Sequence, residues 1–311
     1  MSNINAFNQL SGYLLSEESR KRIERIILNV AIVSFVTHLL LIFLSDFGIL
    51  HIGIGNELLS SPIAAIYTPF SFILIYEVYL LIFYLPKSFT TYISKQYEII
   101  VLIIIRRLFK DFSSLSITPD WFKIKYDLQF TYDIIAALVL FFLIYLFRKE
   151  GLKRYSNKKL SMAESEGLLR FIKIKKSIAS LLIPLIFIVS VYSLINWLWI
   201  TLGTHVGGGI NAFRNINKVF FEQFFTILIV VDVVLLLFSF FHTDEFHKII
   251  RNSGFIISTI LIRLSFSVEG LLNTLLIVAA IVFGLLLLII YNKYESQSAR
   301  HTESDLVTEE N

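Results

Sequence analysis

The sequence predicts an all-α integral membrane protein with about eight transmembrane helices, arranged as two tandem parallel four-helix repeats. Its 311 residues are 56% hydrophobic and 17% charged, whereas a soluble domain is roughly 45–50% apolar and about 25% charged. The apolar residues gather in runs of about 17 to 25, the length that crosses roughly 30 Å of hydrocarbon as a helix. Two hydrophobic segments with matching charges then indicate an internal duplication.

The duplication is visible in charges within apolar sequence. Glu77 and Arg107 in the first half correspond to Asp232, 155 residues after Glu77, and to Arg263, 156 residues after Arg107. An even number of spans in each repeat gives both halves the same orientation in the membrane. The repeats are therefore predicted to be related by a pseudo-two-fold axis along the membrane normal.

The chain divides into five predicted parts. Residues 1–25 are polar and basic and predict a cytoplasmic amphipathic segment. The first four-helix repeat covers 26–147, a basic cytoplasmic connector covers 148–176, and the second repeat covers 177–291. Residues 292–311 are hydrophilic, a composition typical of a disordered cytoplasmic tail.

Eight apolar segments are predicted to cross the membrane in order. The predicted spans lie near 26–45, 62–85, 97–112, 131–147, 177–200, 219–241, 253–267 and 271–291. The third and seventh are short and charged, and without them the count falls to six. Either number is even, so both termini lie on the same side.

The basic residues predict the orientation. On one side of the membrane lie 20 of the 28 Lys and Arg residues, counting both termini, the connector 148–176 and the second and sixth connections between spans. Cytoplasmic loops are the ones enriched in Lys and Arg. We therefore expect a protein of the cell (inner) membrane with both termini in the cytoplasm. No cysteine is present, which excludes disulfides and thiolate metal sites.

The intramembrane charges are the candidate functional residues. Helical rise places Glu77 and Arg107 at similar depth, and the same arithmetic applies to Asp232 and Arg263. A charge at the bilayer centre costs at least about 2.5–3.5 kcal/mol, so these residues are expected as buried ion pairs. Such pairs either fix helix packing or belong to an ion pathway or voltage sensor.

Arg106 breaks the symmetry between the halves, because the aligned position in the second half is Ile262. We therefore expect Arg106 to be an unpaired functional charge, or to extend its side chain outward to the interface. Asp133 and Glu269 stand at the starts of the fourth and eighth predicted spans. They are expected to be solvated helix starts, where an acid is favourable to the helix dipole.

A four-helix unit with an acid on its second helix and arginines further along is similar in architecture to a voltage-sensor domain. Voltage sensors space several arginines three apart on the fourth helix. Here Arg106 and Arg107 are adjacent and Arg263 is single, and all three lie on third helices. The likeness is one of architecture and implies no family membership.

Two glycine-containing loops on the outer side are weaker candidates. His51 begins HIGIG and His205 begins HVGGG, 154 residues apart. Two histidines near a pseudo-two-fold axis are suited to binding a metal or to sensing external pH. Glycine-lined carbonyl sites for ions and ordinary turns are the alternatives. Whether His51 and His205 bind a metal is not decided by the sequence.

Three functions remain open at this stage. The first is an ion channel or transporter whose path is lined or gated by the paired charges. The second is a non-transporting membrane subunit or sensor that docks a partner through the basic connector, and the third is voltage sensing. No nucleotide, zinc-protease or nucleophile motif is present, so no enzyme activity and no cofactor are expected. The expected partners are the lipid bilayer and a second copy or another membrane protein, and nucleic acid is not expected.

Overall fold

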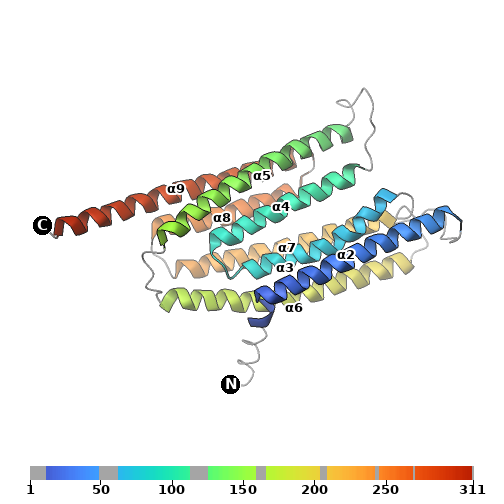
Figure 1. The fold of residues 1–311 in the computed structure, drawn as a ribbon, viewed down its shortest axis with the longest axis horizontal. Coiled ribbons are helices and arrows are strands. Elements are labelled where there is room, and N and C mark those ends of the chain that lie inside the picture. Colours follow the sequence, from blue (N-terminus) through green and yellow to red (C-terminus); the bar gives the residue numbers. More distant parts are fainter. Residues whose placement is uncertain are drawn as a thin grey trace, which may run out of the picture. The chain divides into compact units, whose positions relative to one another are not determined.

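The described residues of the computed structural model are 12–48, 62–112, 125–158, 166–203, 209–241, 245–268 and 270–309. Within these ranges the chain is almost entirely helical and contains no strand (Figure 1). The predicted all-α fold is therefore confirmed for the part of the chain that the structure describes.

The first helix, α2, spans Glu17–Asp46 and packs against α3, which spans Tyr67–Tyr84. Ser16 caps α2, because its hydroxyl accepts a hydrogen bond from the Ser19 amide at 3.1 Å. A 3-10 helix, η2 (Pro62–Ile66), leads into α3.

Contacts at both ends fix α2 antiparallel to α3. At one end the Tyr79 hydroxyl donates to the Leu14 carbonyl at 2.9 Å. At the other end the His38 ring contacts the Thr68 hydroxyl at 2.5 Å. His38 is therefore a helix–helix contact, the role its isolated position in an apolar segment favours.

The next two helices are α4 (Phe89–Phe112) and α5 (Lys125–Lys158). Ser88 caps the start of α4, because its hydroxyl accepts a hydrogen bond from the Thr91 amide at 3.2 Å. The predicted third span began only at 97. The extra turns contain buried Thr90, Tyr92, Ser94 and Gln96, which a hydropathy criterion assigns to a loop. At 24 residues, α4 is about 36 Å long.

The second half of the chain contributes α6 (Glu166–Gly203), α7 (Gly209–Phe240), α8 (Phe246–Ser265) and α9 (Leu271–Glu309). α8 begins seven residues before the predicted span. Its first turns are polar, and a hydropathy criterion therefore assigned them to a loop, as for α4. α8 packs against α9. Gly270, just before α9, has a positive φ of 77°, a conformation that glycine adopts without strain. Helix α9 continues to Glu309, across the segment whose composition predicted disorder.

The helices contribute to two compact units, each described by itself. Unit 1 contains 1–86, 106–126 and 174–228, and unit 2 contains 87–105, 127–173 and 229–311. The boundaries fall within α4, α5, α6 and α7, and the one in α5 comes after its second residue. Unit 1 therefore includes α2 and α3, whereas unit 2 includes the rest of α5 together with α8 and α9.

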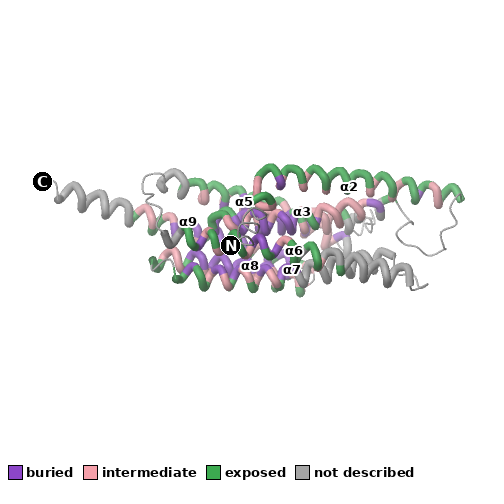
Figure 2. Tube along the Cα trace, turned by 90° about the horizontal axis from the view of Figure 1, so that it is seen from below, coloured by how far each residue is buried: buried purple, intermediate pink, exposed green. Residues whose placement is uncertain are grey.

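Burial differs between helices (Figure 2). In unit 2 the Tyr97 ring packs edge-on against Phe147 at 5.1 Å, and Phe147 lies 5.6 Å from Phe255. A Cβ on Gly284 of α9 would overlap the Tyr97 hydroxyl, so glycine permits this close packing. Most of the α2 surface is exposed and apolar.

Three described helical segments are long and apolar enough to cross a membrane. They are Glu17–Asp46 of α2, Asp127–Lys153 of α5 and Leu271–Gln297 of α9. Shorter apolar segments are found at Thr68–Tyr84 and Phe224–Phe240. These lengths agree with insertion into a membrane.

Candidate functional site

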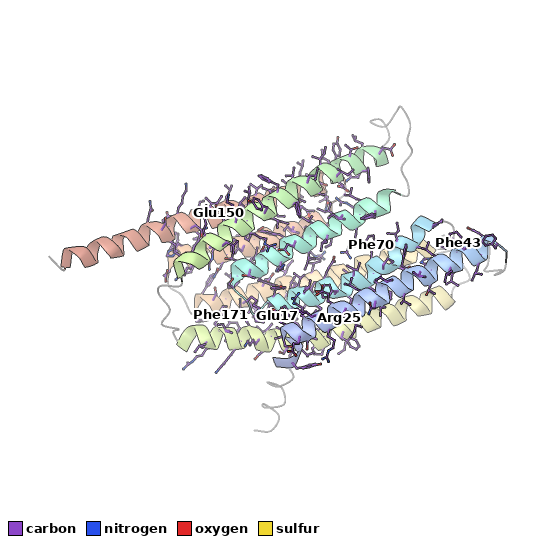
Figure 3. All side chains as sticks on the ribbon, in the orientation of Figure 1. Glu17, Arg25, Phe43, Phe70, Glu150 and Phe171 are labelled. Carbon is purple, nitrogen blue, oxygen red and sulfur yellow. The ribbon has the colours of Figure 1, made fainter. Side chains whose placement is uncertain are left out.

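A buried ion pair joins α3 to the end of α4 within unit 1. The side chain of Glu77 is only 2% exposed, and its Oε2 accepts a hydrogen bond from Arg106 Nη2 at 2.6 Å. Arg106, 13% exposed, also donates through Nη1 to the carbonyl of Phe70 at 3.3 Å. Phe70, which is labelled in Figure 3, lies seven residues or about two turns before Glu77 on α3. The guanidinium therefore holds two acceptors on one helix.

The second oxygen of this carboxylate has different surroundings. Glu77 Oε1 is buried and has no hydrogen-bond partner among the described residues. A buried polar group without a partner costs about 1–3 kcal/mol, and more when it is charged. The hydrogen-bonding capacity of the Glu77 carboxylate is therefore only partly used. Its Oε1 is able to bind a proton or a cation, or to accept a hydrogen bond.

The identity of the arginine corrects the sequence-based expectation. Arg107 was predicted to pair with Glu77 and Arg106 to be the unpaired charge, but Arg106 forms the pair. Successive residues on an α-helix point about 100° apart. The two adjacent arginines thus point in different directions, and depth arithmetic alone does not select the one that binds Glu77. Arg107 is half-buried.

The second predicted acid lies in unit 2 and has neutral donors. Asp232 of α7 is buried, and its Oδ1 accepts from the Tyr92 hydroxyl at 2.9 Å. Its Oδ2 accepts from Gln96 Nε2 at 3.2 Å. Tyr92 and Gln96 are four residues apart and lie on the same face of α4. Neither donor was predicted from the sequence, although a spacing of four residues is the signal for two side chains on one helix face.

Arg263 was predicted as the partner of Asp232, and that pair stays a prediction. Arg263 is half-buried in the last turn of α8.

Asp133 is a buried residue that the sequence analysis placed in solvent. α5 begins eight residues earlier, at Lys125, so Asp133 is in its third turn and fully buried. Its Oδ1 accepts from Gln129 Nε2 and from the Thr274 hydroxyl of α9, each at 3.0 Å. The solvated helix start expected there is therefore wrong, and Asp133 instead joins α5 to α9 within unit 2.

The remaining candidates lie outside the described residues. These are His51, His205 and Glu269. Within the described ranges, no group of three or more His, Cys, Asp or Glu residues is arranged to hold a metal ion.

Comparison of the chain with protein-family models, curated proteins and solved structures finds no match. The function is therefore inferred from the geometry of the buried acids.

Proposed function

We propose that the chain is a non-enzymatic integral membrane protein that moves an ion or small charged solute as a channel or transporter. The Glu77–Arg106 pair and Asp232 line or gate its path. The observation that carries this proposal is the Glu77 carboxylate, almost wholly buried, with one oxygen on Arg106 and the other without a hydrogen bond among the described residues.

This geometry favours an exchangeable site over a packing device. An ion pair that serves only to fix helices is stable when its remaining hydrogen-bonding groups are also satisfied. In the Glu77 site Arg106 is shared with the Phe70 carbonyl, and Glu77 keeps an open oxygen. A cation or proton arriving at that oxygen competes with Arg106 for the same charge. Arg106 then retains a partner in the Phe70 carbonyl, which lowers the cost of the exchange.

The proposed architecture is eight transmembrane helices in two repeats, 26–147 and 177–291, related by a pseudo-two-fold axis normal to the membrane. An offset of 155 residues brings α2 onto α6, α3 onto α7 and α4 onto α8. Each compact unit also draws on both repeats, since α2 and α3 occur with parts of α6 and α7, and α5 occurs with α8 and α9.

The proposed location is the inner membrane with both termini in the cytoplasm. The lengths of α4 and α8, 24 and 20 residues, support two spans that looked short in sequence. Both reach about 30 Å or more at the helical rise. Labelling of single-cysteine variants at the termini and in the outer loops of a cysteine-free chain would test this topology.

Flux through liposomes containing the purified protein tests the function. Parallel gradients of H⁺, Na⁺, K⁺ and Cl⁻ would be applied to the parent, Glu77→Gln, Asp232→Asn and the double variant. We expect at least a tenfold change in the flux of one ion in the double variant. Glu245→Gln is the matched control, because Glu245 is a 51% exposed acid paired with Lys248. Parental flux in a folded double variant would refute the proposal.

A second function, docking of a membrane partner, is favoured by the lengths of two helices in unit 2. α5 and α9 have 34 and 39 residues, about 51 and 58 Å, against roughly 30 Å of hydrocarbon. Asn292 Nδ2 donates to the Glu150 carbonyl at 2.9 Å and ties these helices together. A stoichiometric partner that co-purifies and is lost from the variant Lys149→Gln, Lys173→Gln, Lys176→Gln would support docking. A homo-oligomer alone would count against it.

A further inference from the structure

The start of α2 carries a basic groove that the proposed transport function does not use. All of its lining residues come from successive turns of one helix face: Glu18, Lys21, Arg22, Arg25, Ile26 and Asn29. Three cations and one acid give the lining a net positive charge, and an amide adds hydrogen-bonding capacity. Arg25 is seen on α2 in Figure 3. The groove therefore offers several donors to an anion.

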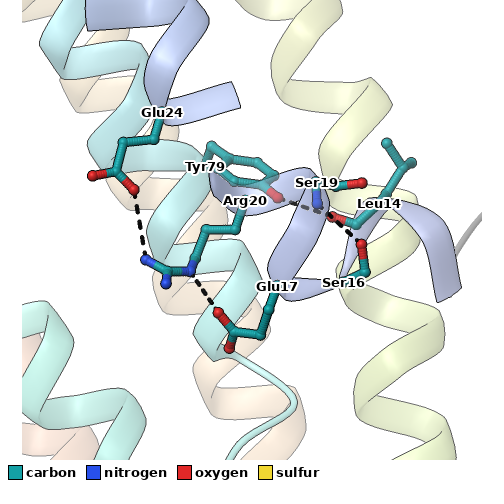
Figure 4. Close-up of polar contacts among 7 residues, drawn as sticks. All are labelled: Leu14, Ser16, Glu17, Ser19, Arg20, Glu24 and Tyr79. Carbon is teal, nitrogen blue, oxygen red and sulfur yellow. Dashed lines mark hydrogen bonds and ion pairs between the residues drawn. The ribbon is translucent and has the colours of Figure 1, made fainter. Parts of the chain in front are cut away.

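The opposite side of this helix is already occupied. There Arg20 pairs with Glu17 at 2.8 Å and Glu24 at 3.8 Å, and the Tyr79 hydroxyl binds the Leu14 carbonyl (Figure 4). The Tyr79–Leu14 hydrogen bond holds the start of α2 against α3, and the Arg20 guanidinium lies 5.7 Å from the centre of the Phe83 ring on α3. The orientation of the helix is thus set by its own packing, and the groove is left on the outward side.

The groove continues into an apolar stripe along the same face. Val33, Val36 and Leu40 follow Asn29 at intervals of four, three and four residues, and all three are exposed. This spacing keeps them on one side of an α-helix. A ligand that fits the whole face needs an anionic end at the groove and an apolar chain along the stripe.

We propose that this face binds the headgroup of an anionic phospholipid, with its phosphate among Lys21, Arg22 and Arg25 and an acyl chain along the stripe. The proposal rests on membrane insertion of α2 and not on transport. Arginine and lysine are the side chains suited to phosphate, and arginine can bind it through two parallel hydrogen bonds. Their aliphatic stems are able to lie along the apolar surface that follows.

Native mass spectrometry of the full chain in detergent tests the proposal. With phosphatidylglycerol added, we expect one tightly retained lipid per chain and weak retention of phosphatidylcholine. Lys21→Gln, Arg22→Gln, Arg25→Gln should weaken binding on the order of 100-fold, because each basic residue near an anionic surface contributes about a factor of five. All three are exposed, and the melting temperature checks that the variant is folded.

The matched control removes the same charge elsewhere, in Lys149→Gln, Lys173→Gln, Lys176→Gln, whose lysines are exposed. It should keep the bound lipid. Equal loss in both variants would show diffuse attraction and overturn the site. Equal retention of phosphatidylcholine would exclude headgroup recognition. Competition by inorganic phosphate at the lipid's own concentration would show a site for free phosphate instead. Loss of transport in the flux assay with lipid retained would affect only the proposed function.

Discussion

Glu77 and Asp232 occupy corresponding positions in the two predicted repeats, yet the structure surrounds them with different donors. In unit 1 a guanidinium on α4 binds Glu77 at 2.6 Å. In unit 2 the Asp232 carboxylate accepts hydrogen bonds from a phenol and an amide at 2.9 and 3.2 Å. The hydrogen bonds described for the two acids thus differ: a guanidinium donates to Glu77, and a phenol and an amide donate to Asp232.

The difference predicts how much stability each carboxylate site loses when one of its donors is removed. Removing one partner of a buried ion pair leaves a charge without compensation, which costs more than the pair itself contributes. Removing one neutral donor from a carboxylate that keeps another costs a single hydrogen bond. The Glu77 site should therefore be the more sensitive of the two to loss of a donor.

The largest expected effect is that of Arg106→Met. The substitution keeps an apolar chain of similar length but leaves Glu77 buried without its cation, so we expect a loss of about 3–5 kcal/mol in unfolding free energy. Denaturant unfolding in detergent micelles would measure it. Adding Glu77→Leu removes the buried charge and should restore most of the loss.

The control for this variant is Arg148→Met. Arg148 is 61% exposed and lies 3.5 Å from Glu98, so its removal should cost less than about 1 kcal/mol. If the Arg106 and Arg148 variants were equally stable, burial would not be what makes the Glu77 pair important, and the comparison would fail.

Tyr92→Phe should have the next largest effect. It removes the hydroxyl that donates to Asp232 and keeps the buried ring, so we expect a loss of about 1.5–3 kcal/mol, the range for a hydrogen bond to a charged group. Tyr145→Phe is the control, because Tyr145 is an exposed tyrosine. A loss for Tyr92→Phe larger than that for Arg106→Met would reverse the ranking of the two sites.

Close packing of neutral groups in unit 2 gives a third test. Gly284→Ala places a methyl group on the Tyr97 hydroxyl, which itself contacts the Ser258 hydroxyl at 2.7 Å. We expect a loss of about 1–3 kcal/mol, as for other overpacked cores. Tyr97→Phe should reduce the cost of Gly284→Ala in a double-mutant cycle. Gly12→Ala is the control, since nothing lies within 4 Å of a Cβ there. Additive losses would show that Tyr97 and Gly284 do not interact.

The helical fold could be predicted because the apolar runs are long and depend only on local sequence. Helix starts were harder, since the first turns of α4 and α8 contain polar residues such as Gln96 and Asn252 that are buried by other helices. Hydropathy does not distinguish a polar residue in a loop from one that is satisfied inside a bundle. Seven or eight residues at these two starts were therefore assigned to loops.

The acids of the site could be predicted, but their partners could not. Glu77 and Asp232 stand out because a charge in apolar sequence is rare. Choosing Arg106 over Arg107 depends on which way one helix is rotated about its axis. Tertiary packing sets that rotation and the sequence spacing does not. The burial of Asp133 likewise depends on where α5 begins.

An exposed ion pair in unit 2 sets the lower limit of the comparison. Lys248 binds Glu245 at 2.5 Å, as short as the Glu77 pair, but Glu245 is 51% exposed. Burial alone would raise the pKa of the Glu245 carboxyl, but the hydrogen bond and charge of Lys248 outweigh it and lower the pKa below its usual value. A carboxyl with a lowered pKa stabilises the fold above its unfolded-state pKa of about 4.3 and loses that contribution as the pH falls through its folded-state value.

Glu245→Gln should therefore have the smallest effect, below about 1 kcal/mol at pH 7, because solvent screens an exposed pair. The difference from the parent should shrink as the pH falls below the unfolded-state pKa of about 4.3 and through the lower folded-state pKa of the carboxyl. Melting curves in detergent at pH 7 and at lower pH values would measure it. A loss at pH 7 as large as that of Arg106→Met would mean that the length of an ion pair, rather than its burial, decides its contribution. The N–O distances of the two ion pairs differ by only 0.1 Å. Burial would then not explain a difference in stability between them.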